Sequence, residues 1–258
     1  MKACILRVAG TNCDAETKRA FEEVGIKAEI IHFNRILQNK NLLFDYQVLA
    51  IPGGFSYGDY VRAGAIWGKR IIAKLRDILG AYLKEDNLII GICNGFQVLV
   101  EAKLLPGLGF DAALAPNKPP GFKCMWICLR CFSSKSPFTC EISRDKVLRM
   151  SIAHGEGRFL LPKENQEKYL EMLMDNEQIV FRYCKPNGEE ANEEFPYNPN
   201  GSFYDIAGIC NSEGNVLGMM PHPERAIYNW QLPDWEVGEG YADGYLIFKS
   251  IIKYLKKK

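Results

Sequence analysis

The sequence predicts an α/β fold whose central sheet is mostly parallel in the first half of the chain. In that half, short β-rich runs alternate with helical patterns, as repeated βαβ units do. The second half is richer in strand-like runs, which predicts added antiparallel strands. The chain has 258 residues, of which 47% are hydrophobic and 24% charged, a composition typical of a globular protein with a substantial core. We therefore expect one domain over residues 1–258.

The elements of the first half follow in order. Residues 3–8, 27–33, 47–51 and 88–93 are short apolar runs and predict buried strands. The intervening segments predict three helices, at 15–24, at 64–83 and from residue 95 onward. The first of these helices places Ala20, Phe21 and Val24 on one face and ends at Gly25.

The second half is expected to add strands at 122–130, 178–184, 204–210 and 215–220, followed by an amphipathic helix from residue 243. Residues 187–202, rich in Asn, Pro, Gly and Glu, predict a long loop.

Composition argues against several kinds of partner. The net charge is +1 and no Lys/Arg stripe crosses the chain, so a nucleic-acid partner is not expected. No apolar run approaches the roughly 18 residues of a membrane span, and no leader pattern is present, so we expect a cytoplasmic protein without membrane contact. Nine cysteines, an odd number without dense spacing, predict free thiols in a reducing compartment.

Residues 91–95, Gly-Ile-Cys-Asn-Gly, have the layout of a nucleophile elbow with cysteine at its centre. A strand ends here and a helix begins, and the flanking glycines leave room for the sharp turn. The helix N-terminus favours a thiolate, so Cys93 is the candidate nucleophile. The alternative is an inert buried cysteine, the usual fate of a free thiol.

A candidate base and its orienting carboxylate lie in residues 221–224, Pro-His-Pro-Glu. The two prolines predict an extended segment in which His222 and Glu224 share a face, so that the carboxylate can fix the imidazole. The alternatives are a structural histidine and a surface carboxylate paired with Arg225.

Two turns offer N–H groups for the oxyanion that forms when sulfur attacks an amide carbon. Pro52-Gly53-Gly54 ends the strand before the elbow strand, so Gly53 and Gly54 can supply one donor, and the amide of Asn94 can supply a second.

With these three motifs in this order, the chain resembles class I glutamine amidotransferases, and among them the glutaminase subunits of phosphoribosylformylglycinamidine synthases. Longer matching segments lie at 53–60, 154–159, 198–202 and 218–225. The resemblance implies a flavodoxin-like three-layer fold and a triad of Cys93, His222 and Glu224. It also implies that the amino-acid end of glutamine is held by Gln97 and by the turn of His154, Gly155, Glu156 and Gly157.

The resemblance further implies partners: a large synthase subunit that binds ATP and Mg²⁺ and converts formylglycinamide ribonucleotide to formylglycinamidine ribonucleotide, and a small accessory subunit. No cofactor or metal is expected in this chain, which carries no Gly-x-x-x-x-Gly-Lys-Ser/Thr phosphate loop. Ammonia would have to reach the partner through a closed passage.

The chain departs from the family at two places. Val8-Ala9-Gly10-Thr11 stands where the family has Phe-Pro-Gly-Ser. Cys124, Cys128 and Cys131, with Cys140 nearby, match the spacing of an iron–sulfur motif. We expect a structural role for them instead, because Cys124, Trp126 and Cys128 alternate in an apolar strand and should point into a core.

Three alternatives remain open from the sequence. The chain could be the glutaminase of a different synthase, a free-standing γ-glutamyl hydrolase that turns over alone, or a degenerate domain that only docks. The intact Cys93, His222 and Glu224 argue against the last of these.

Overall fold

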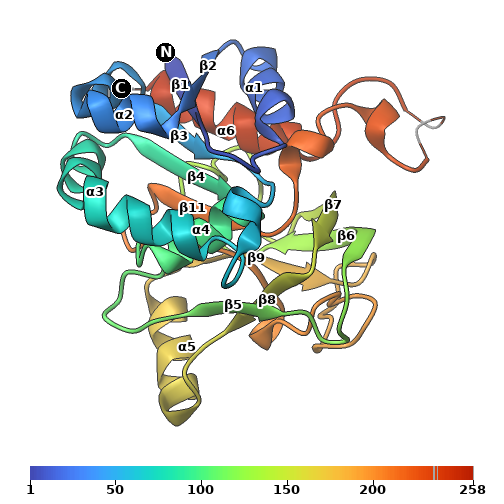
Figure 1. The fold of residues 1–258 in the computed structure, drawn as a ribbon. Helices are drawn as coiled ribbons and strands as arrows, with labels where there is room; N and C mark the ends of the chain where they lie inside the picture. Colours follow the sequence, from blue (N-terminus) through green and yellow to red (C-terminus); the bar gives the residue numbers. More distant parts are fainter. Residues whose placement is uncertain (235, 237, 258) are drawn as a thin grey trace.

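The protein is described by a computed structural model that covers residues 1–234, 236 and 238–257. A twisted nine-stranded sheet runs through the molecule in the order β2-β1-β3-β4-β11-β10-β9-β6-β7 (Figure 1). Its strands are β1 (Lys2–Arg7), β2 (Lys27–His32), β3 (Val48–Ile51), β4 (Leu88–Ile92), β6 (Lys123–Cys131), β7 (Val147–His154), β9 (Ile179–Cys184), β10 (Ile206–Cys210) and β11 (Val216–Met219).

The sheet is parallel from β2 to β11 and antiparallel from β11 to β7, as the two halves of the sequence predict. Strand β4 lies between β3 and β11 in the parallel part and is buried along its whole length. Ile51 of β3 pairs with Gly91 of β4, and Met219 of β11 pairs with Ile92. Because these parallel strands end in register, the segments that follow them meet at one edge of the sheet.

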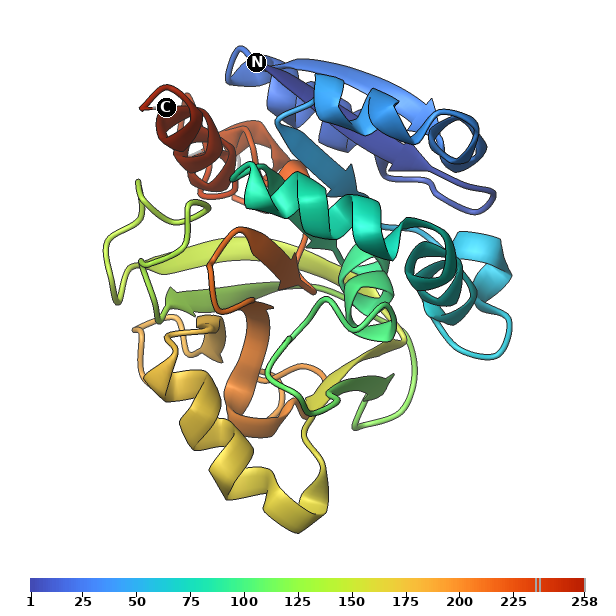
Figure 2. The ribbon, with the colours of Figure 1, turned by 90° about the vertical axis from the view of Figure 1, so that its left-hand side faces the viewer.

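Helices cover both faces of the parallel part. The helices α3 and α4 pack together on one face, and α1 and α6 pack together on the other (Figures 1 and 2). None of the helices in the described ranges is long and apolar enough to cross a membrane. The six helices of these ranges are α1 (Asp14–Glu23), α2 (Phe33–Gln38), α3 (Ala65–Lys84), α4 (Asn94–Glu101), α5 (Gln166–Asp175) and α6 (Tyr245–Leu255).

Five helices and strands of the described ranges lie outside the sequence predictions, and one of them is the short helix α2, which directly follows β2. A two-stranded ribbon of β5 (Ala113–Pro116) and β8 (Glu156–Leu160) and the helix α5 extend from the antiparallel half (Figure 1). The fifth is β7, whose buried positions alternate strictly along the strand. Its apolar residues Leu148, Met150 and Ile152 carry that alternation in the sequence, so the signal for this strand was present.

The predicted strands and helices are otherwise confirmed, with ends displaced by one or two residues. The segment 187–202 contains neither helix nor strand, as its composition predicts.

Candidate functional site

Cys93 lies at the corner between β4 and α4 in the strained backbone conformation that an elbow requires, with φ 51° and ψ −106°. The corner tolerates no side chain at its flanks. A Cβ on Gly95 would lie 1.8 Å from the carbonyl oxygen of Ile51, and one on Gly91 would lie 2.6 Å from that of Gly95. The sulfur itself lies 3.7 Å from the carbonyl oxygen of Ala153 on β7.

His222 follows the carboxyl end of β11, and its Nδ1 lies 2.6 Å from Oε1 of Glu224. The two residues meet by a route different from the predicted one. His222 is extended, with φ −102° and ψ 91°, but Pro223–Arg225 forms a short 3₁₀ turn. Proline is compatible with the first position of such a turn, so the segment curls and brings Glu224 back onto the imidazole.

The imidazole is held in a buried, charged environment: His222 is 1% exposed and Glu224 2%. Burial opposes a positive charge on the ring, but the Glu224 carboxylate, followed by the thiols of Cys93 and Cys13, outweighs it and raises the pKa of His222 well above its usual value. A buried carboxylate at 2.6 Å thus favours the imidazolium that forms when the ring accepts a proton.

Cys93 and His222 line one cavity of about 140 Å³, which is large enough to hold an amide group. Its wall includes Gly54 of the predicted oxyanion turn, and Asn94 directly follows the nucleophile. Sequence reasoning missed the other lining residues, which come from segments distant along the chain: Asn12, Cys13, Phe55, Phe122, Ala153 and Arg225.

The predicted oxyanion turn is fixed by close backbone packing. The carbonyl oxygen of Gly53 accepts the N–H of Cys13 at 3.1 Å. Gly54 has φ 149°, and a Cβ there would lie 2.6 Å from the carbonyl oxygen of Gly10. Only glycine allows this close approach, which fixes the turn where Gly54 lines the cavity.

The residues predicted to hold the amino-acid end of glutamine lie together. Nε2 of Gln97 donates to the carbonyl oxygen of Glu156 at 2.5 Å, and Nδ2 of Asn94 donates to Oε1 of Gln97 at 2.9 Å. Gly155 continues this turn. A Cβ on Gly157 would lie 2.3 Å from the ring of His154, so the turn depends on glycine.

His154 begins the same turn but is not placed as a base. It is 3% exposed, and its Nδ1 lies 3.1 Å from Oδ1 of Asn117. Burial, aided by the charge of His222, lowers the pKa of His154 to about 3. This histidine is neutral at physiological pH and supports the turn that it begins.

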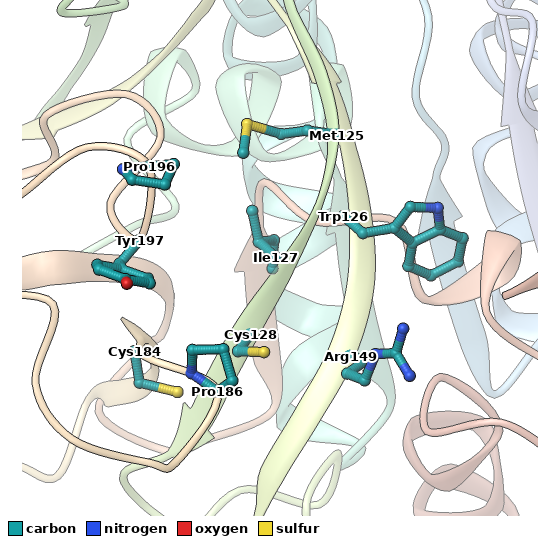
Figure 3. A pocket seen from close by; sticks show the side chains of 9 residues that line it. All are labelled: Met125, Trp126, Ile127, Cys128, Arg149, Cys184, Pro186, Pro196 and Tyr197. Atoms are coloured by element: carbon teal, nitrogen blue, oxygen red, sulfur yellow. The ribbon is translucent and has the colours of Figure 1, made fainter. Parts of the chain in front are cut away.

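The structure corrects the prediction for the cysteines of β6. The face that carries Cys124, Trp126 and Cys128 is exposed or half-buried, and the core face carries Cys131. Cys128 lines a separate cavity of about 250 Å³ together with Cys184 (Figure 3). Because Cys128 and Cys131 point to opposite faces of one strand, they are not placed to share a single cluster.

All nine cysteines are free thiols. Cys140 is exposed near α6, and its sulfur lies 3.3 Å from the carbonyl oxygen of Ser250.

The comparisons with known proteins agree with this geometry. Residues 1–255 match the model of the CobB/CobQ-like glutamine amidotransferase domain. The phosphoribosylformylglycinamidine synthase subunit PurQ of Archaeoglobus fulgidus is 44% identical, with 100% of this chain and 98% of the relative covered. The PurQ subunit of Pyrococcus horikoshii is 41% identical, with both chains fully covered.

Among solved structures, a chain of PurLQS from Thermotoga maritima is 33% identical and superposes with a TM-score of 0.73, covering 98% of each chain. The match extends over the sheet, the elbow and the antiparallel half together. This chain therefore belongs to the family of CobB/CobQ-like glutamine amidotransferase domains that includes the PurQ subunits of phosphoribosylformylglycinamidine synthase.

Proposed function

We propose that this chain is the glutaminase subunit of a phosphoribosylformylglycinamidine synthase of purine biosynthesis, and that it hydrolyses glutamine to glutamate and ammonia through a thioester on Cys93. One observation carries the assignment of roles. The strained Cys93 corner opens into the same cavity as a buried imidazole whose Nδ1 lies 2.6 Å from the Glu224 carboxylate. This arrangement supports a nucleophile, a base and an orienting group in one site.

In the proposed reaction His222 accepts the thiol proton of Cys93, and the sulfur attacks the side-chain amide carbon of glutamine. The C–N bond then breaks and His222 returns its proton to the departing nitrogen, which leaves as ammonia. Water, deprotonated by the same imidazole, cleaves the thioester to release glutamate. Glu224 stays ionised throughout and steadies the imidazolium.

The negative charge on the amide oxygen would be stabilised by backbone N–H groups. We assign this role to Asn94, at the first position of α4, and to the turn of Gly53 and Gly54, whose second glycine lines the cavity. Fixed donors of this kind contribute about 3–4 kcal/mol each to transition-state stabilisation.

The amino-acid end of the substrate is assigned to Gln97 and the turn from His154 to Gly157. The contact between Gln97 and Glu156 supports this, because it joins the elbow helix to the turn beside Cys93. A substrate held at that end would present its side-chain amide to the sulfur.

We further propose that the ammonia passes to a large synthase subunit, which uses ATP with Mg²⁺ to convert formylglycinamide ribonucleotide to formylglycinamidine ribonucleotide, and that a small accessory subunit completes the assembly. The likeness to a chain of PurLQS supports this partnership. A sheet that is continuous from β2 to β7 supports a single domain over 1–258. The nine free thiols support a cytoplasmic location.

The decisive experiment compares two nitrogen sources in the reconstituted complex. Cys93→Ala should abolish product formation from glutamine while leaving the ammonia-dependent reaction of the synthase intact. Cys140→Ala, an exposed thiol, is the matched control and should change neither reaction. Unchanged glutamine-dependent synthesis in Cys93→Ala would overturn the assignment of the nucleophile and leave a docking role for this domain.

A further inference from the structure

The catalytic cavity contains a second thiol that the reaction proposed above does not use. Cys13 lies at the N-cap of α1, is 1% exposed, and lines the same cavity as Cys93. Its sulfur accepts a hydrogen bond from Nη2 of Arg225 at 3.0 Å. The folded chain thus places this thiol against the segment of the proposed base, more than 200 residues away in sequence.

Three donor atoms of different chemistry converge at this point. The sulfur of Cys13, a ring nitrogen of His222 and a carboxylate oxygen of Glu224 all lie within 4.8 Å of one another, and all three residues are buried. Two further atoms of the group are unsatisfied. Among the residues that the structure describes, neither Nε2 of His222 nor Oε2 of Glu224 has a hydrogen-bond partner. Buried polar atoms are costly to leave without a partner, and they favour a group that binds them.

Thiolate, imidazole and carboxylate are the donors that Zn²⁺ prefers in proteins, at bond lengths of about 2.0–2.3 Å. In a tetrahedral site such donors lie roughly 3.3–3.8 Å apart, so no pair within 4.8 Å would have to close by more than about 1.5 Å. Cys93 lines the same cavity and can supply a fourth donor.

The local charge suits a divalent cation. Burial raises the pKa of the Cys13 thiol, so its negative charge forms when a metal ion displaces the thiol proton. The sulfur and the carboxylate of Glu224 would then face the cation together. The guanidinium of Arg225, which faces the thiol, also contacts Glu16 at 3.9 Å, and this carboxylate offsets its repulsion of a metal ion.

We propose that a thiophilic divalent cation of the Zn²⁺ class binds Cys13, His222 and Glu224 and thereby inhibits the glutaminase. Coordination displaces the thiol proton of Cys13 and the proton of the His222 ring nitrogen that binds the metal. Both protons are released to water, and the oxidation state of sulfur is unchanged. Once His222 is held by the metal, its imidazole is no longer free to accept the proton of Cys93. Cys13 therefore serves as a metal ligand and takes no part in turnover.

The test uses Co²⁺ as a spectroscopic substitute for Zn²⁺ on the full-length reduced chain. A thiolate bound to Co²⁺ gives a charge-transfer absorption band, and Zn²⁺ should displace the cobalt and abolish it. We expect the band in the wild type, in Cys93→Ala, which retains Cys13, and in Cys140→Ala, the exposed-thiol control. Cys13→Ala should weaken binding by about 100-fold or more, because it removes a ligand.

The opposite pattern would overturn the proposal: a band that survives in Cys13→Ala and disappears in Cys93→Ala would assign the metal to the nucleophile alone. If Cys13→Ala does not fold, as judged by circular dichroism, Cys13→Ser replaces it with the same expectation. Glu224→Gln in the Cys93→Ala background should also weaken binding, and unchanged affinity there would exclude the carboxylate. These measurements follow metal binding and not turnover, so their outcome is independent of the proposed glutaminase reaction.

Discussion

Gly53→Ala is a sensitive test of the geometry around the proposed base. The substitution keeps the backbone N–H of the oxyanion turn and adds one methyl group. The new Cβ would lie 2.8 Å from Cε1 of His222 and 3.1 Å from the sulfur of Cys13. Carbon atoms approach comfortably only to about 3.5 Å, so the imidazole would have to move by roughly 0.7 Å. A displacement of that order in a catalytic group costs about 10²-fold in rate, or roughly 2.7 kcal/mol.

The assay measures glutamine-dependent and ammonia-dependent synthesis in the reconstituted complex, together with the rate at which iodoacetamide alkylates Cys93. We expect kcat with glutamine to fall by about 10²-fold, KM to change little, and the ammonia-dependent rate to stay unchanged. Gly80→Ala is the matched control, since its Cβ would meet nothing within 4 Å. Full glutaminase activity in Gly53→Ala, with alkylation as fast as in the wild type, would show that the His222 ring is not confined as described.

Three further outcomes are expected. Glu224→Gln removes the charge beside His222 and should lower glutamine-dependent kcat by about 10³- to 10⁴-fold, measured at saturating glutamine; a loss below tenfold would contradict its role. Because burial lowers the pKa of His154 to about 3, the unfolded chain binds the extra proton below about pH 6.5. The free energy of unfolding should therefore fall with decreasing pH in that window, by at most about 1.4 kcal/mol per pH unit. Measured by urea unfolding at a series of pH values, this free energy should depend less steeply on pH in His154→Gln. Gly95→Ala would place a Cβ 1.8 Å from the Ile51 carbonyl oxygen and should cost about 3 kcal/mol or more in urea unfolding, whereas a cost below 1 kcal/mol would contradict the tight corner.

The sequence predicted the parallel half of the fold well because its signals are local. Apart from β2, which runs directly into α2, each strand of that half is a short apolar run closed by glycine or proline, and each predicted helix shows one apolar face. Prediction missed α2 and β7. It also missed β5, β8 and α5, where weakly patterned segments acquire their structure by packing on the rest of the molecule. It also misjudged β6, because its alternating cysteines do not reveal which face will be covered.

Within the candidate site, the sequence by itself determined the chemical groups. Two short motifs carry these groups: Cys93 between glycines, and His222 two residues before Glu224. Each motif can be recognised without knowing how the rest of the chain folds.

Only the tertiary structure decided how these groups meet and what joins them. The in-register ends of β3, β4 and β11 bring the turn, the thiol and the imidazole to one edge, and β7 forms the wall behind the sulfur. The position of Cys13 beside Arg225 depends on the same folding, since no local pattern relates residues so far apart. The physical reason is that periodicity and turn chemistry act over a few residues, whereas a cavity is built by the packing of distant segments.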